Sequence, residues 1–236
     1  EQKRFILREF FQANWDNMIR PHRRYWELMN ERGLHLEPGP LDNQTIGRFN
    51  TNAYRDIQVW FNLAWFGYRA REKFPAINEF IRKGGYFTEE DKREVLSLQL
   101  QVIGELLPLY RRMQDAGQVE LTTSPFYHPI LPLLCDSEFA WRAMPGAKLP
   151  ERFTCPEDAR EQIRKAVAFH AQTFGRPPKG MWPSEGSVAP EIIPLVSEAG
   201  LKWMATDEGI LAHTLQAWNI YDHLYQVSRL IEAGVD

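Results

Sequence analysis

Cysteine is scarce in this chain: its 236 residues include only Cys135 and Cys155. Two cysteines do not build a disulfide framework, and their spacing matches no zinc motif. The chain also lacks a run of about 18 apolar residues, so no transmembrane helix is expected. The N-terminal sequence EQKRFILREFF has neither the apolar core nor the cleavage site of a signal peptide. These features favour reduced thiols in a cytoplasmic protein, with a lone disulfide or a reactive thiol as alternatives.

Strong charge of either sign is missing as well. The net charge is −3, which gives no reason to expect nucleic acid or an anionic membrane as partner. The sequence contains no Gly-rich phosphate loop, no G-x-S-x-G elbow and no H-E-x-x-H zinc motif. A metal-dependent polysaccharide deacetylase would need paired Asp and closely spaced His ligands, and the chain does not provide them. We therefore expect neither a metal nor a cofactor.

Aromatic residues, by contrast, are abundant: they make up 13% of the chain and include eight Trp. Large stacking side chains fit a hydrophobic core, and they also fit a groove that binds the apolar faces of sugar rings. The cluster WFNLAW at 60–65 is more typical of a core than of a sugar platform. Met181 and Trp203 fall within expected strands, and we predict that both belong to the core.

The first half of the chain is expected to be helical. Apolar residues spaced by three and four predict one helix over about 5–19 and another around 25–29 that ends at Gly33. Residues 33–50 hold two Pro and three Gly, which predicts a loop.

Helix is expected again over 51–66. A long connection then leads to Thr88, which suits an N-cap because an acidic first turn follows it. The helix that begins there is expected to reach about Gln114, with a kink at Pro108.

After Gly117 the pattern changes to short strands and helices. A Pro-rich loop is expected between the first strand and the next helix. The predicted strands are 118–123, 179–183 and 201–206, and the predicted helices between them are 155–174 and 189–199. Connections this short imply parallel strands with right-handed crossovers.

Polar residues follow each predicted strand, at the end where ligands bind in α/β folds. They are His128, Glu185 and the pair Asp207 and Glu208. Glu185 stands between Trp182 and small residues that leave room for a ligand, which favours a site over a solvated turn. His128 could equally be a buried histidine satisfied by the backbone. Asp207 is a candidate substrate-binding residue with Glu208, although the pattern favours a helix cap or a supporting role there.

Three segments carry a resemblance: QVELTTSPFYHPILPLL at 118–134, GMWPSEGSV at 180–188 and WMATDEG at 203–209. They resemble motifs of glycoside hydrolase family 57, and the likeness extends through most of the chain. The resemblance implies an α/β fold, part of an incomplete (β/α)7 TIM-like barrel with a large helical portion at the N-terminal side. In these terms 1–236 is a partial catalytic domain, with 1–115 mainly helical and 116–236 the barrel portion.

The resemblance also implies chemistry. The family contains α-amylases, amylopullulanases, 4-α-glucanotransferases and branching enzymes, all retaining, so the implied substrate is an α-glucan or oligosaccharide. The Glu of the family's W-x-x-E motif is the nucleophile and falls on Glu185. His128 corresponds to the His of the Y-H-P segment, and with Trp182 it is expected to contact the sugar.

Two family features have no counterpart in this chain. No His-Gln-Pro strand motif occurs, and no strand after 203–209 carries the acid/base Asp, so we assign that role to none of Asp207, Asp222 and Asp236. The chain is therefore expected to be an internal piece of a longer enzyme. A catalytically incomplete carbohydrate-binding relative is the main alternative, and a helical interaction module formed by 1–115 is a third. The sequence does not indicate an oligomeric state.

Overall fold

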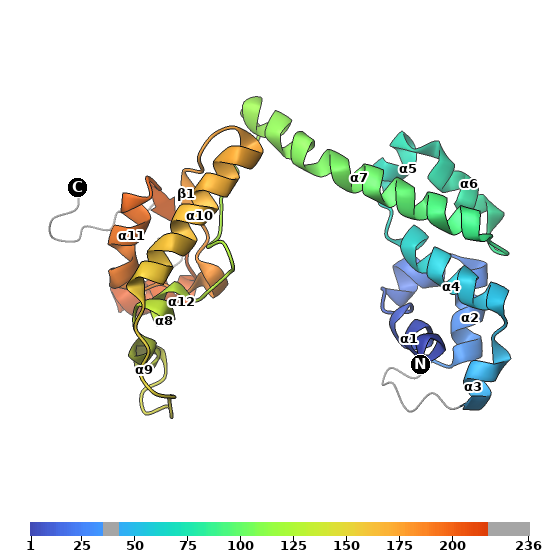
Figure 1. Cartoon of the computed structure of the whole chain (residues 1–236), viewed down its shortest axis with the longest axis horizontal. Helices are drawn as coiled ribbons and strands as arrows, with labels where there is room; N and C mark the ends of the chain where they lie inside the picture. Colours follow the sequence, from blue (N-terminus) through green and yellow to red (C-terminus); the bar gives the residue numbers. More distant parts are fainter. Residues whose placement is uncertain (35–42, 217–236) are drawn as a thin grey trace. The chain divides into compact units, whose positions relative to one another are not determined.

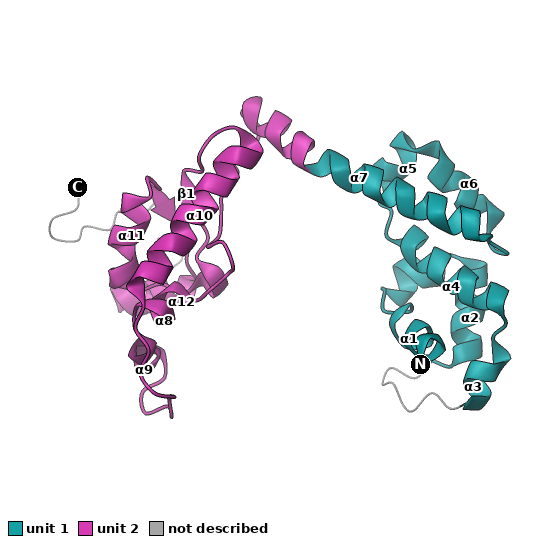
Figure 2. Cartoon of the chain, in the orientation of Figure 1, with its two compact units in different colours: residues 1–106 teal, residues 107–236 magenta. Residues whose placement is uncertain are grey.

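The computed structural model describes residues 1–34 and 43–216. The chain divides into two compact units, Glu1–Leu106 and Leu107–Asp236 (Figure 1 and Figure 2). Each unit has a hydrophobic core formed by its own residues. The boundary lies within helix α7 (Glu89–Asp115).

Unit 1 is helical throughout its described part. Helix α4 contacts α1, α2 and α6, and its buried side chains form the centre of the core. The elements before α7 are α1 (Gln2–Glu9), a π-helical turn (Trp15–Ile19), α2 (Arg23–Arg32), α3 (Asn43–Arg48), α4 (Thr51–Ala64), α5 (Tyr68–Lys73) and α6 (Pro75–Lys83). The largest fully buried side chains of this unit include Tyr25, Leu28, Ile57, Leu63, Ile77 and Phe87.

The helix predicted over 5–19 is wrong as a single element. Helix α1 ends at Glu9, and the π-helical turn begins only after Asn14, whose side chain accepts a hydrogen bond of 2.9 Å from the Asn17 N–H. This cap starts a new turn and interrupts a pattern that is continuous in apolar spacing.

The two predicted connections of unit 1 also contain helices. The segment predicted as a loop over 33–50 contains helix α3. The Ile46 carbonyl of α3 accepts a hydrogen bond of 3.1 Å from the Tyr54 hydroxyl. Residues 35–42 of this segment lie outside the described part. Before Thr88, α5 and α6 replace the expected long connection. Pro75 opens α6 and Gly84 closes it with φ 74°, so residues that read as loop formers act here as helix boundaries.

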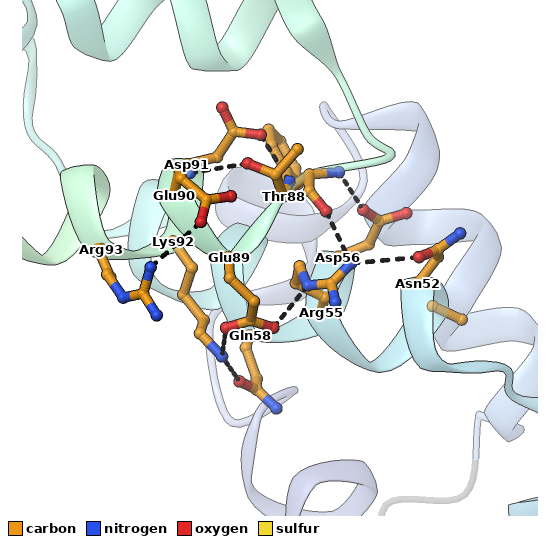
Figure 3. Close-up of polar contacts among 12 residues, drawn as sticks. Asn52, Arg55, Asp56, Gln58, Thr88, Glu89, Glu90, Asp91, Lys92 and Arg93 are labelled. Carbon is orange, nitrogen blue, oxygen red and sulfur yellow. Dashed lines mark hydrogen bonds and ion pairs between the residues drawn. The ribbon is translucent and has the colours of Figure 1, made fainter.

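The helices predicted at 51–66 and from Thr88 are confirmed as α4 and α7. The Thr88 hydroxyl accepts the Asp91 N–H at 3.1 Å, while the Asp91 carboxylate accepts the Thr88 N–H at 2.6 Å (Figure 3). This reciprocal pair satisfies two backbone donors at the helix start. Hydrogen bonds from Lys92 and Arg55 lower the pKa of Glu89, in the first turn, to about 2. The helix continues through Pro108.

Unit 2 combines helices with a small parallel sheet. After α7 its elements are α8 (Leu131–Cys135), a 3₁₀ turn (Ser137–Phe139), α9 (Ala140–Ala143), α10 (Pro156–Phe174), β1 (Gly180–Met181), 3₁₀ turns at Ser184–Gly186 and Pro190–Ile192, α11 (Ile193–Glu198), β2 (Trp203–Met204) and α12 (Glu208–Leu215). The helices predicted at 155–174 and 189–199 are confirmed, the second as a 3₁₀ turn joined to α11. The predicted Pro-rich loop is wrong in part, because it contains the short helix α8.

The predicted parallel arrangement is confirmed. Strand β1 pairs with β2 in parallel, with Gly180 opposite Trp203 and Met181 opposite Met204. Thr123 forms a parallel bridge to Met181. The strand predicted over 118–123 is otherwise wrong, because β1 is only two residues long and offers a partner to Thr123 alone among the described residues. The three segments lie side by side, with β1 between Thr123 and β2.

Burial separates the two faces of this sheet. Met181 is fully buried in the core with Ile163 and Leu195, as predicted. Trp203 is 43% exposed, so its predicted place in the core is wrong. Alternation puts Trp203 on the face opposite to Met204.

In unit 1, Trp60 is buried as predicted, whereas Trp65 is exposed where α4 ends.

Candidate active site

Three segment ends meet along one edge of the small sheet. The Trp182 N–H donates to the Thr123 carbonyl at 2.9 Å, and the Ala205 N–H donates to the Met181 carbonyl at 3.1 Å. These bonds tie together the points at which the three parallel segments end. The residues that follow include His128, Glu185 and Asp207, as the sequence predicted.

His128 and Glu185 are in direct contact. The His128 Nε2 lies 3.2 Å from the Glu185 Oε1, although 57 residues separate them in the chain. Both side chains are open to solvent, with 54% and 76% of their surface exposed. The alternative of a buried, backbone-satisfied His128 is therefore wrong. An exposed carboxylate with an imidazole at hydrogen-bond distance can attack a substrate or bind its hydroxyl groups.

Both residues also share an unusual backbone conformation. His128 has φ 57° and Glu185 has φ 55°, in the left-handed region that residues other than Gly rarely adopt. Each such position costs about 1 kcal/mol or more, and strain of this kind clusters at functional sites. Local turns hold both residues in place. The His128 N–H donates to the Pro125 carbonyl at 2.9 Å, and the Gly186 N–H donates to the Pro183 carbonyl at 2.9 Å.

Trp182 lies over the turn that presents Glu185. A Cβ at Gly186 would lie 3.4 Å from the Trp182 Cη2, so the glycine allows the indole to approach the backbone closely. Gly186 is itself left-handed, with φ 65°. Trp182 is 42% exposed, so part of the indole surface is free to pack against an apolar ligand face.

Asp207 and Glu208 begin helix α12. The Asp207 carboxylate accepts the Gly209 N–H at 2.7 Å, so it caps the helix, as the pattern favoured. Glu208 lies exposed in the first turn. No described hydrogen bond joins either carboxylate to Glu185.

Sequence reasoning missed Thr206 and Gly186. The Thr206 hydroxyl donates to the Gly186 carbonyl at 2.9 Å, which connects the end of β2 to the turn around Glu185. Ser184, just before Glu185, is 1% exposed, and its hydroxyl has no partner among the described residues. A glycine directly after the candidate nucleophile was the available signal for a left-handed turn.

The rest of the described chain adds three observations. Cys135 and Cys155 are both free thiols, as favoured above. Within residues 1–34 and 43–216, no group of three or more His, Cys, Asp or Glu side chains could hold a metal ion. In the same ranges, no helix is long and apolar enough to cross a membrane. Asp222 and Asp236 lie outside the described residues.

A carboxylate, an imidazole and an exposed indole thus lie just beyond the ends of three parallel segments. The family model described as glycosyl hydrolase family 57 matches residues 2–231. The chain therefore belongs to glycosyl hydrolase family 57.

Named relatives agree with this assignment. The chain is 29% identical over 178 residues to alpha-amylase 1 of Dictyoglomus thermophilum, covering 75% of this chain and 21% of that protein. It is 24% identical over 172 residues to an alpha-amylase of Pyrococcus furiosus, covering 72% and 21%. A 1,4-alpha-glucan branching enzyme of Thermococcus kodakarensis is 28% identical over 124 residues, covering 50% and 16%. The chain thus spans about a fifth of the length of these relatives. No solved structure matches it.

Proposed function

We propose that this chain is part of the catalytic domain of a retaining enzyme that acts on α-glucans, either as a hydrolase or as a glucanotransferase. The contact between His128 and Glu185, both in left-handed conformations at neighbouring segment ends, carries the proposal. The names of the relatives, alpha-amylase and 1,4-alpha-glucan branching enzyme, support an α-glucan as the substrate class. An incomplete (β/α)7 barrel is the fold proposed for the whole domain, and the parallel order of its three segments here is consistent with it.

Glu185 is the proposed nucleophile. Its carboxylate attacks the anomeric carbon, the glycosidic C–O bond breaks, and the leaving oxygen takes a proton from a second carboxyl group. Water or an acceptor sugar, deprotonated by that second group, then displaces Glu185. The Glu185 side chain is 76% exposed, which leaves its carboxylate open to an approaching sugar.

His128 and Trp182 are proposed to hold the sugar. The imidazole lies against one carboxylate oxygen, where it can also hydrogen bond a hydroxyl group of the ring beside the reacting carbon. The exposed indole supports the apolar face of a sugar. For Asp207 and Glu208 we propose contacts with neighbouring hydroxyl groups, made in the case of Asp207 by the oxygen that does not cap α12.

The second carboxyl group is not assigned. Retention requires the two groups to lie roughly 5–5.5 Å apart. Asp222 and Asp236 lie outside the described residues, and the resemblance transfers the role to neither. The free thiols Cys135 and Cys155 support a cytoplasmic location for the enzyme.

Removal of the nucleophile gives a direct test. With α-maltosyl fluoride as substrate the leaving fluoride needs no proton donor, so the Glu185→Ala protein with added azide should form β-maltosyl azide, because azide enters from the face that Glu185 vacates. Without azide we expect a loss of turnover of several orders of magnitude. Glu198→Gln, on the exposed surface of α11, is the matched control. Normal turnover by the Glu185→Ala protein would sink the proposal.

A catalytically incomplete carbohydrate-binding relative is the second candidate. The intact protein would then bind maltooligosaccharides without forming products, and chromatography of the sugars after incubation with the unmutated protein separates the two cases.

A further inference from the structure

Unit 1 contains a hollow that the proposed reaction does not use. Its volume is about 440 Å³, within the range of small-molecule sites. The side chains that line it include His22, Arg23, Arg24, Glu27, Lys83 and Tyr86. His22 stacks on the buried Trp60 with ring centroids 4.4 Å apart, so the imidazole is fixed in place.

Tyr86 lines this hollow and is exposed to solvent. Its φ is 54°, and 75% of its surface is exposed. The backbone is anchored on both sides of it: the Trp60 Nε1 donates to the Gly84 carbonyl at 3.1 Å, and the Phe87 N–H donates to the buried Asp56 at 3.0 Å. Both anchors come from α4, where Figure 3 shows Asp56. An exposed aromatic ring on a strained, anchored loop is a feature of binding sites more than of free loops.

The charges around the hollow are balanced. The Arg24 Nε lies 3.0 Å from the Asp56 carboxylate, and the Arg23 Nε lies 2.9 Å from Glu27. Lys83 pairs with Asp91. Because each of these cations has a carboxylate partner, the hollow is a poor site for an anion.

Its remaining hydrogen-bonding groups suit a neutral ligand. Burial, together with the charge of Arg71, lowers the pKa of His22, so the imidazole is neutral near pH 7 and offers one donor and one acceptor. Arg24 adds guanidinium donors, and Glu27 adds carboxylate acceptors. The Arg24 guanidinium lies 5.7 Å from the centre of the Tyr86 ring, which brings hydrogen-bond donors and the aromatic surface together.

We propose that this hollow is a second saccharide site, which binds glucosyl units of an α-glucan. The Tyr86 ring packs against the apolar face of a sugar, while His22, Arg24 and Glu27 hydrogen bond its vicinal hydroxyl groups. The choice of α-glucan among saccharides rests on the proposed function. A second point of attachment holds polymers more firmly than short oligosaccharides.

The test compares two exposed tyrosines of the intact protein. Tyr86→Ala removes the ring at the hollow, and Tyr68→Ala removes the ring of a residue that is 84% exposed on α5 and does not line it. Binding of maltoheptaose is measured by calorimetry and retardation by glycogen is measured in gels, with Glu185→Gln present in every variant to prevent turnover. We expect Tyr86→Ala to weaken glycogen retardation about five- to tenfold, with Tyr68→Ala and Tyr86→Phe close to the parent.

A second variant keeps the test decisive if Tyr86→Ala does not fold. Glu27→Gln alters a half-exposed acceptor and should weaken binding in the same assay. Unchanged glycogen retardation in Glu27→Gln and in any folded Tyr86→Ala protein overturns the second site. Activity on maltotriose, measured with Glu185 intact, should be unaffected by Tyr86→Ala. If Glu185→Gln retains turnover while Tyr86→Ala loses glycogen binding, the proposed reaction fails and the saccharide site stands.

Discussion

The indole of Trp203 occupies the space in which a side chain at position 180 would begin. A Cβ placed on Gly180 would lie 2.1 Å from the Trp203 Cε2, far inside contact distance. The two residues face each other across β1 and β2, and the Trp203 Nε1 donates to the Glu120 carboxylate at 3.0 Å. The indole therefore packs directly on the strand that leads to Glu185.

Gly180→Ala should destabilise unit 2 by about 1–3 kcal/mol, because the added methyl group collides with a ring that a hydrogen bond holds in position. Trp203→Ala in the same protein should remove most of that penalty. Urea unfolding of the two single variants and the double variant measures the coupling. Additive losses in the double variant would show that the Gly180→Ala penalty does not arise from the Trp203 indole.

Thr206 should affect chemistry through its hydrogen bond to Gly186. Thr206→Val keeps the shape but removes the donor, at a cost of about 1 kcal/mol in stability. Because the bond holds the carbonyl directly after Glu185, we expect kcat to fall about fivefold while KM changes little. Thr206→Ser retains the hydroxyl and should restore kcat.

Steady-state kinetics on a maltooligosaccharide, with thermal unfolding measured in parallel, distinguishes positioning from simple stabilisation. A Thr206→Val protein with lower Tm but unaltered kcat would assign Thr206 a structural role only.

Glu89 should make stability depend on pH in the acid range. Hydrogen bonds from Lys92 and Arg55 lower its pKa in the folded chain from 4.5 to about 2. The folded state therefore holds this proton less tightly than the unfolded state. The stabilisation is complete above about pH 5 and is lost as the pH falls through 4.5 towards 2.

Urea midpoints of the parent and Glu89→Gln proteins between pH 6 and pH 3 test this expectation. The difference between the two should shrink as the pH falls, and Glu94→Gln, exposed on the same helix, serves as the control variant. A Glu89→Gln difference that stays constant with pH would contradict the assigned hydrogen bonds.

Long helices were predictable because their signals are local. Helices α4, α7 and α10 each combine repeated apolar spacing with a recognisable start, such as Thr88 or Pro156. The short helices α3, α5 and α6 were not, since they extend over fewer turns than periodicity can reveal. The predicted length of the strand over 118–123 was wrong for a different reason. The number of its residues that pair depends on the partner segment, which lies more than 50 residues away in the chain.

The candidate site divides in the same way. The strand pattern predicted which residues follow the strand ends, and it therefore selected His128 and Glu185 as neighbours. It did not predict their left-handed backbones or the Thr206 hydrogen bond, because these depend on how the turns are held in three dimensions.

The left-handed backbone at Glu185 lowers the stability of the fold, and the residue that adopts it is the proposed nucleophile. Glycine at this position would adopt φ 55° without strain, so replacement of the carboxylate residue by glycine relaxes the turn while it removes the proposed nucleophile. The strain at this position is therefore tied to the residue on which the proposed chemistry depends.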